Sequence, residues 1–292
     1  MRTSLISLLV GAALAAAPHA AAEELHAFAD SSRLVAIGGS LTEIVYALGE
    51  EGRLVGRDQT ATYPEAAAAL PDVGYARQLA PEGVLSVSPT ALLVLEGSGP
   101  PEALEVLSQA GVEYQTVPES YSAEGVIAKI NAVGEALGIE EKAEAYAAEV
   151  QAQFAALAGV TASIEEPKRV LFVLSVEGGK IQASGTDTAA DGMIALAGAE
   201  NAITEYSGYK ALTEEAIISA APDAIVMMDR GGDHAATDAE LLAHPAVALT
   251  QVVENKAIYR LDGSYLLGFG PRTAAAATEL AGLLYSEHAQ AE

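Results

Sequence analysis

The sequence predicts an α/β protein of two similar lobes with mainly parallel sheets, joined by one long backbone helix. Three observations predict this fold. Short apolar strands alternate with helices in both halves, a helix–proline–strand unit occurs once in each half, and a long helical region without strand signals separates them. The chain has 292 residues, the length of about two ordinary domains. We expect an N-terminal lobe at 23–122, a connecting helical region at 123–166 and a C-terminal lobe at 167–292.

Residues 1–22 have the pattern of a secretory signal peptide. Arg2 precedes an apolar run from Leu5 to Ala17, and small residues end the segment at Ala22. The run is too short to span a bilayer. We expect cleavage after Ala22 and export to the periplasm. No lipid anchor is expected, because lipid attachment needs a cysteine at the cut and the chain has none.

The elements of the first half follow from short apolar runs and helix signals. A strand at 33–37 leads through two glycines into a helix, in which Ser40 and Glu43 are expected to form a capping box and which Gly49 ends. Further strands are expected at 54–55, 91–95 and 112–117, and further helices at 81–87 and 100–110.

The long helical region covers 123–158 and is expected to break near Gly138. Strand–helix alternation resumes beyond Pro167, and the segment 174–180 is expected to be a loop. The apolar and helical segments of this half lie at 169–174, 188–196, 214–221, 224–228, 258–261 and 273–285.

The repeated unit is the clearest sign of two related halves. Residues 82–95 align with residues 215–228: each begins with a glutamate that opens a short helix, continues to a proline and ends in an apolar strand. Pro89 and Pro222 stop their helices and turn the chain toward extended geometry. Each unit is followed by a glycine-containing loop.

Composition excludes several classes of function. The formal net charge of −25 gives no sequence-independent attraction for nucleic acid or anionic lipid. The lack of cysteine removes disulfides, thiolate metal sites and cysteine nucleophiles. No phosphate-binding loop, dinucleotide fingerprint or nucleophile elbow is present, and His234 with Asp238 fits a polar loop better than a catalytic pair. We therefore do not expect an enzyme, and histidines are too few for a zinc or manganese carrier.

Several strings of the chain resemble a known family. The run Val35-Ala-Ile-Gly-Gly-Ser-Leu-Thr-Glu-Ile-Val-Tyr-Ala-Leu-Gly49 resembles the opening of helical-backbone periplasmic binding proteins, which serve siderophore, cobalamin and haem ABC importers. The Gly-Tyr75-Ala-Arg77 step within 70–85 is similar to the haem-binding branch, in which this tyrosine is the iron ligand. Supporting strings are 184–191, 208–212 and 268–273. The resemblance implies a ligand cleft between the lobes and ferric haem as the transported ligand.

The chemistry of these residues fits the implied ligand. A tyrosine phenolate is a hard oxygen donor for ferric haem iron. Coordination requires loss of the phenol proton, which iron and a nearby guanidinium favour. In an extended loop Arg77 would share a face with Tyr75, where it could support the phenolate or bind a propionate. Tyr63, in a Tyr-Pro pair, is the rival ligand, and Tyr209 fits a stacking role in the second lobe.

Further cations and two carboxylates complete the implied site. Arg230 follows the second repeat strand, where a loop would face a propionate. Arg272 begins a helix after Gly-Pro and suits either propionate support or a structural role. Glu82 and Glu215 complement helix N-termini. The family suggests that such a pair, one in each lobe, docks on arginines of the inner-membrane permease.

One departure from the family concerns stoichiometry. Some haem carriers place a histidine in the second-lobe loop and hold two haems, but residues 174–180 contain none; the histidines are His19, His26, His234, His244 and His288. We therefore expect one haem per monomer, received from an outer-membrane uptake system. A siderophore or cobalamin carrier of the same fold is the alternative, although a chain without tryptophan and with 4 phenylalanines builds an aromatic cleft poorly.

Overall fold

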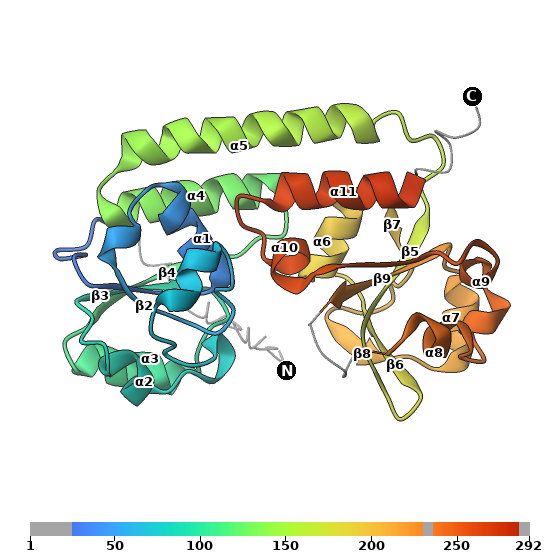
Figure 1. Ribbon diagram of the computed structural model, residues 1–292, viewed down its shortest axis with the longest axis horizontal. Coiled ribbons are helices and arrows are strands. Elements are labelled where there is room, and N and C mark those ends of the chain that lie inside the picture. The colour runs from blue at the N-terminus through green and yellow to red at the C-terminus, as the bar shows by residue number, and fades with distance from the viewer. Residues whose placement is uncertain (1–24, 230–235, 286–292) are drawn as a thin grey trace, which may run out of the picture.

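The computed structural model describes residues 25–229 and 236–285 as two α/β lobes beneath a long helix (Figure 1). The predicted signal peptide, Arg230 and His234 lie outside the described residues. The first lobe contains a parallel four-stranded sheet in the order β2-β1-β3-β4. Its strands are β1 (Leu34–Ile37), β2 (Leu54–Arg57), β3 (Ala91–Leu95) and β4 (Glu113–Val117).

Both faces of this sheet are buried, which explains the unbroken apolar run of β1. Leu34 and Ala36 pack toward helices α1 and α4, whereas Val35 and Ile37 pack toward the opposite layer with Val84. The helices and 3₁₀ turns of this lobe are α1 (Gly39–Ala47), η1 (Glu51–Arg53), η2 (Glu65–Ala69), η3 (Ala76–Gln78), α2 (Pro81–Leu85) and α3 (Pro101–Gln109).

The expected capping box at the start of α1 is wrong. Gly38 is the N-cap residue, and the backbone N–H of Gly39 donates to the hydroxyl oxygen of Thr60 at 2.8 Å. The buried carboxylate of Glu43 accepts hydrogen bonds from Arg272 of the second lobe instead. A charged partner from a distant part of the chain therefore replaces the local bond that the spacing indicated.

The second lobe contains a mixed six-stranded sheet in the order β10-β9-β5-β6-β8, with β7 paired to β5. Its strands are β5 (Arg169–Glu177), β6 (Lys180–Ser184), β7 (Glu200–Asn201), β8 (Tyr209–Ala211), β9 (Ala224–Asp229) and β10 (Ile258–Asp262). Its helices are α6 (Ala189–Leu196), α7 (Glu214–Ala220), α8 (Asp238–Leu242), η4 (Val247–Leu249), α9 (Gln251–Asn255), α10 (Gly263–Leu267) and α11 (Thr273–Tyr285).

The segment expected to be a loop at 174–180 is a β-hairpin. β5 continues to Glu177, and β6 starts antiparallel to it at Lys180. Gly178 and Gly179 both have positive φ, the conformation that a two-residue hairpin turn needs. β5 pairs in parallel with β7 and β9, and β9 pairs in parallel with β10, which confirms the prediction of mainly parallel sheets. The antiparallel part of the sheet consists of the pairs β5–β6 and β6–β8.

The lobes share one helical layer. α4 (Ala123–Leu137) ends at Gly138, which is left-handed with φ 66°, and α5 (Glu140–Thr161) follows, as the sequence predicts. The 22 residues of α5 span about 33 Å. α5 packs on α4 and on α11, which lie end to end beneath it (Figure 1). One apolar cluster accordingly contains residues of both lobes and of all three helices.

The internal repeat is visible in three dimensions. β3 lies beside β1 in the first lobe, and β9 lies beside β5 in the second, each in parallel. The helix before each strand is anchored by one equivalent buried side chain, Val84 in α2 and Ile217 in α7. In the part of the chain that is described, no helix is long and apolar enough to cross a membrane.

The contact between α4 and α5 provides a test of the shared layer. A Cβ at Gly134 would lie 2.2 Å from the Cβ of Ala143, so Gly134→Ala should force the helices apart and destabilise the protein by about 1–3 kcal/mol. Gly159, on α5, has open space around it, so Gly159→Ala should stabilise by about 0.5–1 kcal/mol. Urea unfolding measures both changes, and equal effects would contradict this packing.

Candidate functional site

Tyr75 stands at the carboxyl end of the first-lobe sheet. It precedes the turn η3, and the preceding Gly74 has φ 112°. The turn is fixed to the loop after β3: Gly99 donates its backbone N–H to Ala76 at 2.8 Å and accepts from Leu79 at 2.8 Å. The side chain of Tyr75 remains 39% exposed. Ligands of open α/β sheets bind at this end of the strands, so the tyrosine is presented where a ligand is expected.

Arg77 lies within the 3₁₀ turn η3, so the expectation of an extended loop at this step is wrong. The turn leaves Arg77 exposed. Among the arginines in the described part of the chain, Arg77 alone forms neither a hydrogen bond nor an ion pair. The others contact carbonyl or carboxylate oxygens. Its guanidinium is therefore available to a bound anion.

Two tyrosines lie within the electrostatic reach of Arg77. Burial raises the pKa of Tyr209, and the charge of Arg77 lowers it. Burial likewise raises the pKa of Tyr121, the carboxylate of Glu119 adds to this rise, and Arg77 opposes it. Tyr209 belongs to β8 of the second lobe, whereas Arg77 belongs to the first. The charge of Arg77 in the first lobe therefore acts on the pKa of an aromatic residue in the second lobe.

Aromatic pairs hold these tyrosines in place. The ring of Tyr209 meets Phe172 edge-on at 6.4 Å between centroids, and the ring of Tyr121 meets Phe269 edge-on at 5.2 Å. The predicted stacking role of Tyr209 thus has a partner in β5. Tyr121 received no prediction from the sequence, because nothing in its local pattern distinguishes it from a packing residue.

Arg272 links the lobes through Tyr63 and Glu43. Its guanidinium carbon lies 3.7 Å from the centroid of the Tyr63 ring, a cation–π contact. Its Nε and a terminal nitrogen donate to the two carboxylate oxygens of Glu43 at 3.0 Å each. This paired geometry is the strong arrangement for arginine and carboxylate. Glu43 is thus the partner that a structural role of Arg272 requires. The guanidinium of Arg272 also covers one face of Tyr63, the rival iron ligand.

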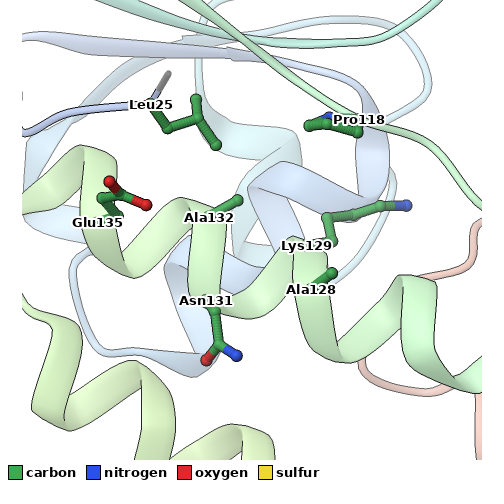
Figure 2. Close-up of a pocket in the computed structure, with 7 residues that line it drawn as sticks. All are labelled: Leu25, Pro118, Ala128, Lys129, Asn131, Ala132 and Glu135. Atoms are coloured by element: carbon green, nitrogen blue, oxygen red, sulfur yellow. The ribbon is translucent and has the colours of Figure 1, made fainter. Parts of the chain in front are cut away.

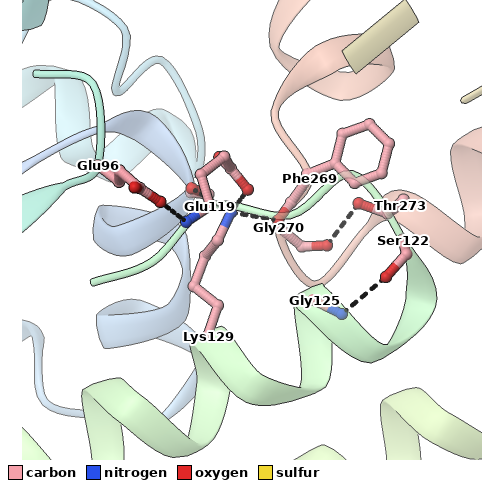
Figure 3. A network of polar contacts seen from close by, with 9 residues as sticks. Glu96, Glu119, Ser122, Gly125, Lys129, Phe269, Gly270 and Thr273 are labelled. Atoms are coloured by element: carbon pink, nitrogen blue, oxygen red, sulfur yellow. Dashed lines mark hydrogen bonds and ion pairs between the residues drawn. The ribbon is translucent and has the colours of Figure 1, made fainter. Parts of the chain in front are cut away.

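A second link between the lobes is buried beneath α1. The side chain of Lys129 is fully buried and donates to Glu119 at 2.7 Å and to the carbonyl oxygen of Phe269 at 3.0 Å (Figure 3). It also contacts the hydroxyl oxygen of Ser40 at 3.4 Å. Phe269 lies just before α11, so one ammonium group ties α4 to the second lobe. The sequence signal for this link is a lysine on the apolar face of α4, but the sequence-based prediction assigned Lys129 no role.

Burial dominates the titration of this pair. It lowers the pKa of Lys129, which Glu119 partly counteracts. It raises the pKa of Glu119, which Lys129 partly counteracts. Each charge is therefore kept in the protein interior by the other, and removal of one leaves the second without compensation.

Arg272, Lys129 and the residues that they contact form what we call the junction between the lobes. Two further predicted residues, Glu82 and Glu215, are not part of it. Glu82 is in the first turn of α2 and Glu215 is in the first turn of α7, and both are exposed. The structure thus separates the predicted residues into a junction group and a pair of carboxylates on short helices.

Two cavities lie beside α4 and contain none of the sequence-predicted site residues. The larger, about 350 Å³, is lined by Leu25, Pro118, Ala128, Lys129, Asn131, Ala132 and Glu135 (Figure 2). The smaller, about 210 Å³, is lined by Asn131, Glu135, Glu140 and Glu144. Within the described residues, no group of three or more histidine, aspartate and glutamate side chains is placed to hold a metal ion.

Comparison with known proteins now identifies the family. A family model described as periplasmic binding protein matches residues 34–265. The chain belongs to the periplasmic binding protein family. In this family the two-lobed fold binds a substrate and does not convert it, so the prediction that the chain is not an enzyme is confirmed. Periplasmic location is likewise supported by the family.

Solved structures of the family superimpose closely on this chain. The periplasmic haem-binding protein BhuT, described in complex with two hemes, is 40% identical, with a TM-score of 0.83 over 86% of this chain and 97% of its own. RhuT from Roseiflexus sp. RS-1, a periplasmic heme-binding protein in apo form, is 38% identical, with a TM-score of 0.83 over 88% of this chain and 99% of its own. The predicted two-lobed fold is confirmed.

A curated relative extends the comparison to lipoproteins. The uncharacterized ABC transporter substrate-binding lipoprotein YvrC of Bacillus subtilis is 29% identical over 262 residues, which is 88% of this chain and 81% of that protein. Its description supports an ABC transporter as the partner of this family. The absence of a lipid anchor on the present chain stays a prediction.

The buried Lys129–Glu119 pair yields a prediction about stability. Lys129→Met should cost about 3–5 kcal/mol near neutral pH, because Glu119 is left buried without its partner. The pKa of Glu119 is already raised above 4.5, and the substitution should raise it further. Protonated Glu119 is favoured in the folded state of the variant, so the loss should be small below pH 4.5, should grow as pH rises from 4.5 to the raised pKa and should level off above it.

Urea unfolding of Lys129→Met at pH 5 and pH 8 measures this dependence. The double variant Lys129→Met/Glu119→Gln, which removes both charges, should lose most of the pH dependence. A Lys129→Met deficit that is equal at both pH values would contradict the buried pair.

Proposed function

We propose that this protein captures ferric haem between its lobes, with the Tyr75 phenolate as the iron ligand, and delivers it to an ABC permease of the inner membrane. The observation that carries the proposal is that Tyr75 and Arg77 are both exposed within one short segment, and that Arg77 forms no hydrogen bond or ion pair with the described residues. Both stand at the carboxyl end of the first-lobe sheet. Relatives at 40% and 38% identity are described as haem-binding proteins, which supports the same ligand here.

The chemistry divides between iron and propionate. The phenolate of Tyr75 supplies a hard, anionic oxygen to Fe(III). Arg77 lies two residues away in the turn η3 and supplies a charge that favours the phenolate or binds a propionate carboxylate. The net charge of the chain is −25, so an anionic ligand is repelled unless a local cation attracts it. Arg77 supplies such a cation at this end of the sheet.

Contacts at the junction favour Tyr75 over Tyr63. The ring of Tyr63 lies against Arg272, which is itself held by Glu43. Movement of Tyr63 toward iron would break this cation–π contact. In the same proposal Arg272 acts mainly as an inter-lobe link. Arg230, which follows Asp229 in the sequence and lies outside the described residues, is a second cation for propionate.

We further propose that one haem is bound, although BhuT is described with two. The hairpin turn at 178–179 contains no histidine, but the Nε2 atom of His244 lies 3.1 Å from the carbonyl oxygen of Gly179. His244 is therefore engaged by the hairpin backbone. A second haem with a histidine ligand from this region would require this contact to break.

Absorption titration with hemin tests the iron ligand. The wild type should develop tyrosinate–haem charge-transfer bands and saturate at one equivalent. Tyr75→Ala should lose the bands and at least about 100-fold in affinity, because the iron loses its protein ligand. Arg77→Gln should keep the bands and lose about tenfold in affinity, the value of one charge-assisted contact.

Tyr63→Ala is the matched control, since Tyr63 is also an exposed tyrosine of the first lobe. It should keep the bands and bind hemin about as tightly as the wild type. Undiminished binding by Tyr75→Ala would overturn the proposal, and saturation at two equivalents would overturn the proposed stoichiometry alone. Preference for a siderophore or a corrinoid over hemin would favour the alternative carrier class.

Delivery is proposed to use Glu82 and Glu215. These carboxylates are exposed at equivalent positions of the repeat, one in each lobe, and would meet cations on the permease. The periplasmic protein would act as a monomer without a lipid anchor, downstream of an outer-membrane haem uptake system.

Charge reversal tests docking apart from ligand binding. Glu82→Lys/Glu215→Lys should abolish hemin transport into proteoliposomes that contain the permease and its ATPase, and should leave hemin affinity unchanged, because neither residue lies at the junction. Glu102→Lys/Glu254→Lys makes the same charge change on exposed helices of the two lobes and should transport normally. Equal transport by both double variants would exclude the proposed docking role.

A further inference from the structure

Two exposed apolar side chains occupy equivalent positions of the internal repeat. Leu85 is 37% exposed and Ile218 is 42% exposed, and both count among the large apolar residues that remain at the surface. Leu85 follows Glu82 by three residues in α2, and Ile218 follows Glu215 by three residues in α7. Each lobe therefore presents a carboxylate and an apolar side chain in the same order.

Helix geometry places each pair on one surface. Residues three apart in a helix are neighbours on the same face. Each helix also has an equivalent buried residue that packs it on its lobe: Val84 is 0% exposed and Ile217 is 1% exposed. Burial of Val84 and Ile217 thus turns Glu82 with Leu85, and Glu215 with Ile218, toward solvent.

The fold accounts for the buried members of the repeat but not for the exposed ones. Val84 and Ile217 complete the outer cores of their lobes. Leu85 and Ile218 belong to neither core cluster. A polar residue would serve the fold as well at both places, so their shared apolar character points to a contact outside the chain.

We propose that Leu85 and Ile218 are apolar anchors of the permease-docking surface, each entering an apolar recess next to the cation that meets Glu82 or Glu215. This inference rests on the proposed docking function and adds a component to it. Long-range charge attraction brings the proteins together but is screened by salt, whereas a buried apolar anchor acts at short range and slows dissociation.

The repeat also specifies the form of the partner. The two pairs have the same residue order in lobes of the same topology, so the permease should present two like recesses, each with a cation beside an apolar wall. Two equivalent sites on one partner are the arrangement of a two-fold symmetric dimer. In Figure 1 both α2 and α7 lie below α5, one in each lobe, so one partner surface can reach both.

Binding to the cognate permease–ATPase complex in nanodiscs tests this inference. The haem-loaded double variant Leu85→Ser/Ile218→Ser should bind at least about tenfold more weakly, mainly through faster dissociation, and each single variant should be intermediate. The salt dependence of association should stay as in the wild type, because the glutamates remain. Hemin affinity and melting temperature should not change.

Val106→Ser/Leu249→Ser is the matched control, since these side chains are 47% and 72% exposed and lie outside α2 and α7. It should bind the permease like the wild type. Wild-type binding by Leu85→Ser/Ile218→Ser would overturn the apolar anchors while leaving the glutamates intact as docking residues. If Glu82→Lys/Glu215→Lys also binds normally, the docking function itself fails.

Discussion

The ion pair between Arg272 and Glu43 fixes the relation between the lobes on which the proposed site depends. Glu43 lies in α1 and Arg272 lies just before α11, so this contact joins residues 229 positions apart in the sequence. Lys129 makes the second tie, through the carbonyl oxygen of Phe269. Together with α5, which packs on helices of both lobes, these contacts restrict hinge motion and keep the carboxyl ends of the two sheets at a set separation.

This constraint explains how the ligand residues are arranged. Tyr75 and Arg77 are held by a turn bonded to the loop after β3, and Tyr209 is held by Phe172 in the facing lobe. Most cations near the junction are committed to protein carboxylates or carbonyls, as Arg272 and Lys129 are. Arg77 is the exception among the described arginines, and this difference separates a structural cation from one available to a ligand. The same frame sets the spacing of α2 and α7, so the proposed ligand site and the proposed docking surface depend on one feature of the fold.

Local signals were sufficient for most of the fold. The helix–proline–strand repeat predicted β3 and β9 correctly, and the positive φ of Gly138 ended α4 where expected. The sequence also predicted Tyr75, Arg77 and Arg272 as site residues, and their roles toward a ligand stay predictions. Three features of the structure differ from the prediction or were absent from it. The hairpin at Gly178 was signalled by its two glycines but was interpreted as a loop. The contacts of Glu43 and of Lys129 join residues 229 and 140 positions apart, and no local spacing reveals such partners.

Spin-label distance measurement between the lobes tests the fixed separation most directly. The chain has no cysteine, so Val106→Cys on α3 and Leu249→Cys on η4 give one exposed label in each lobe. Double electron–electron resonance should give a single narrow distance distribution, and addition of diamagnetic gallium protoporphyrin should move its mean by less than its width. A broad distribution in the free protein, or a large shortening upon binding, would contradict a site held in place by the junction.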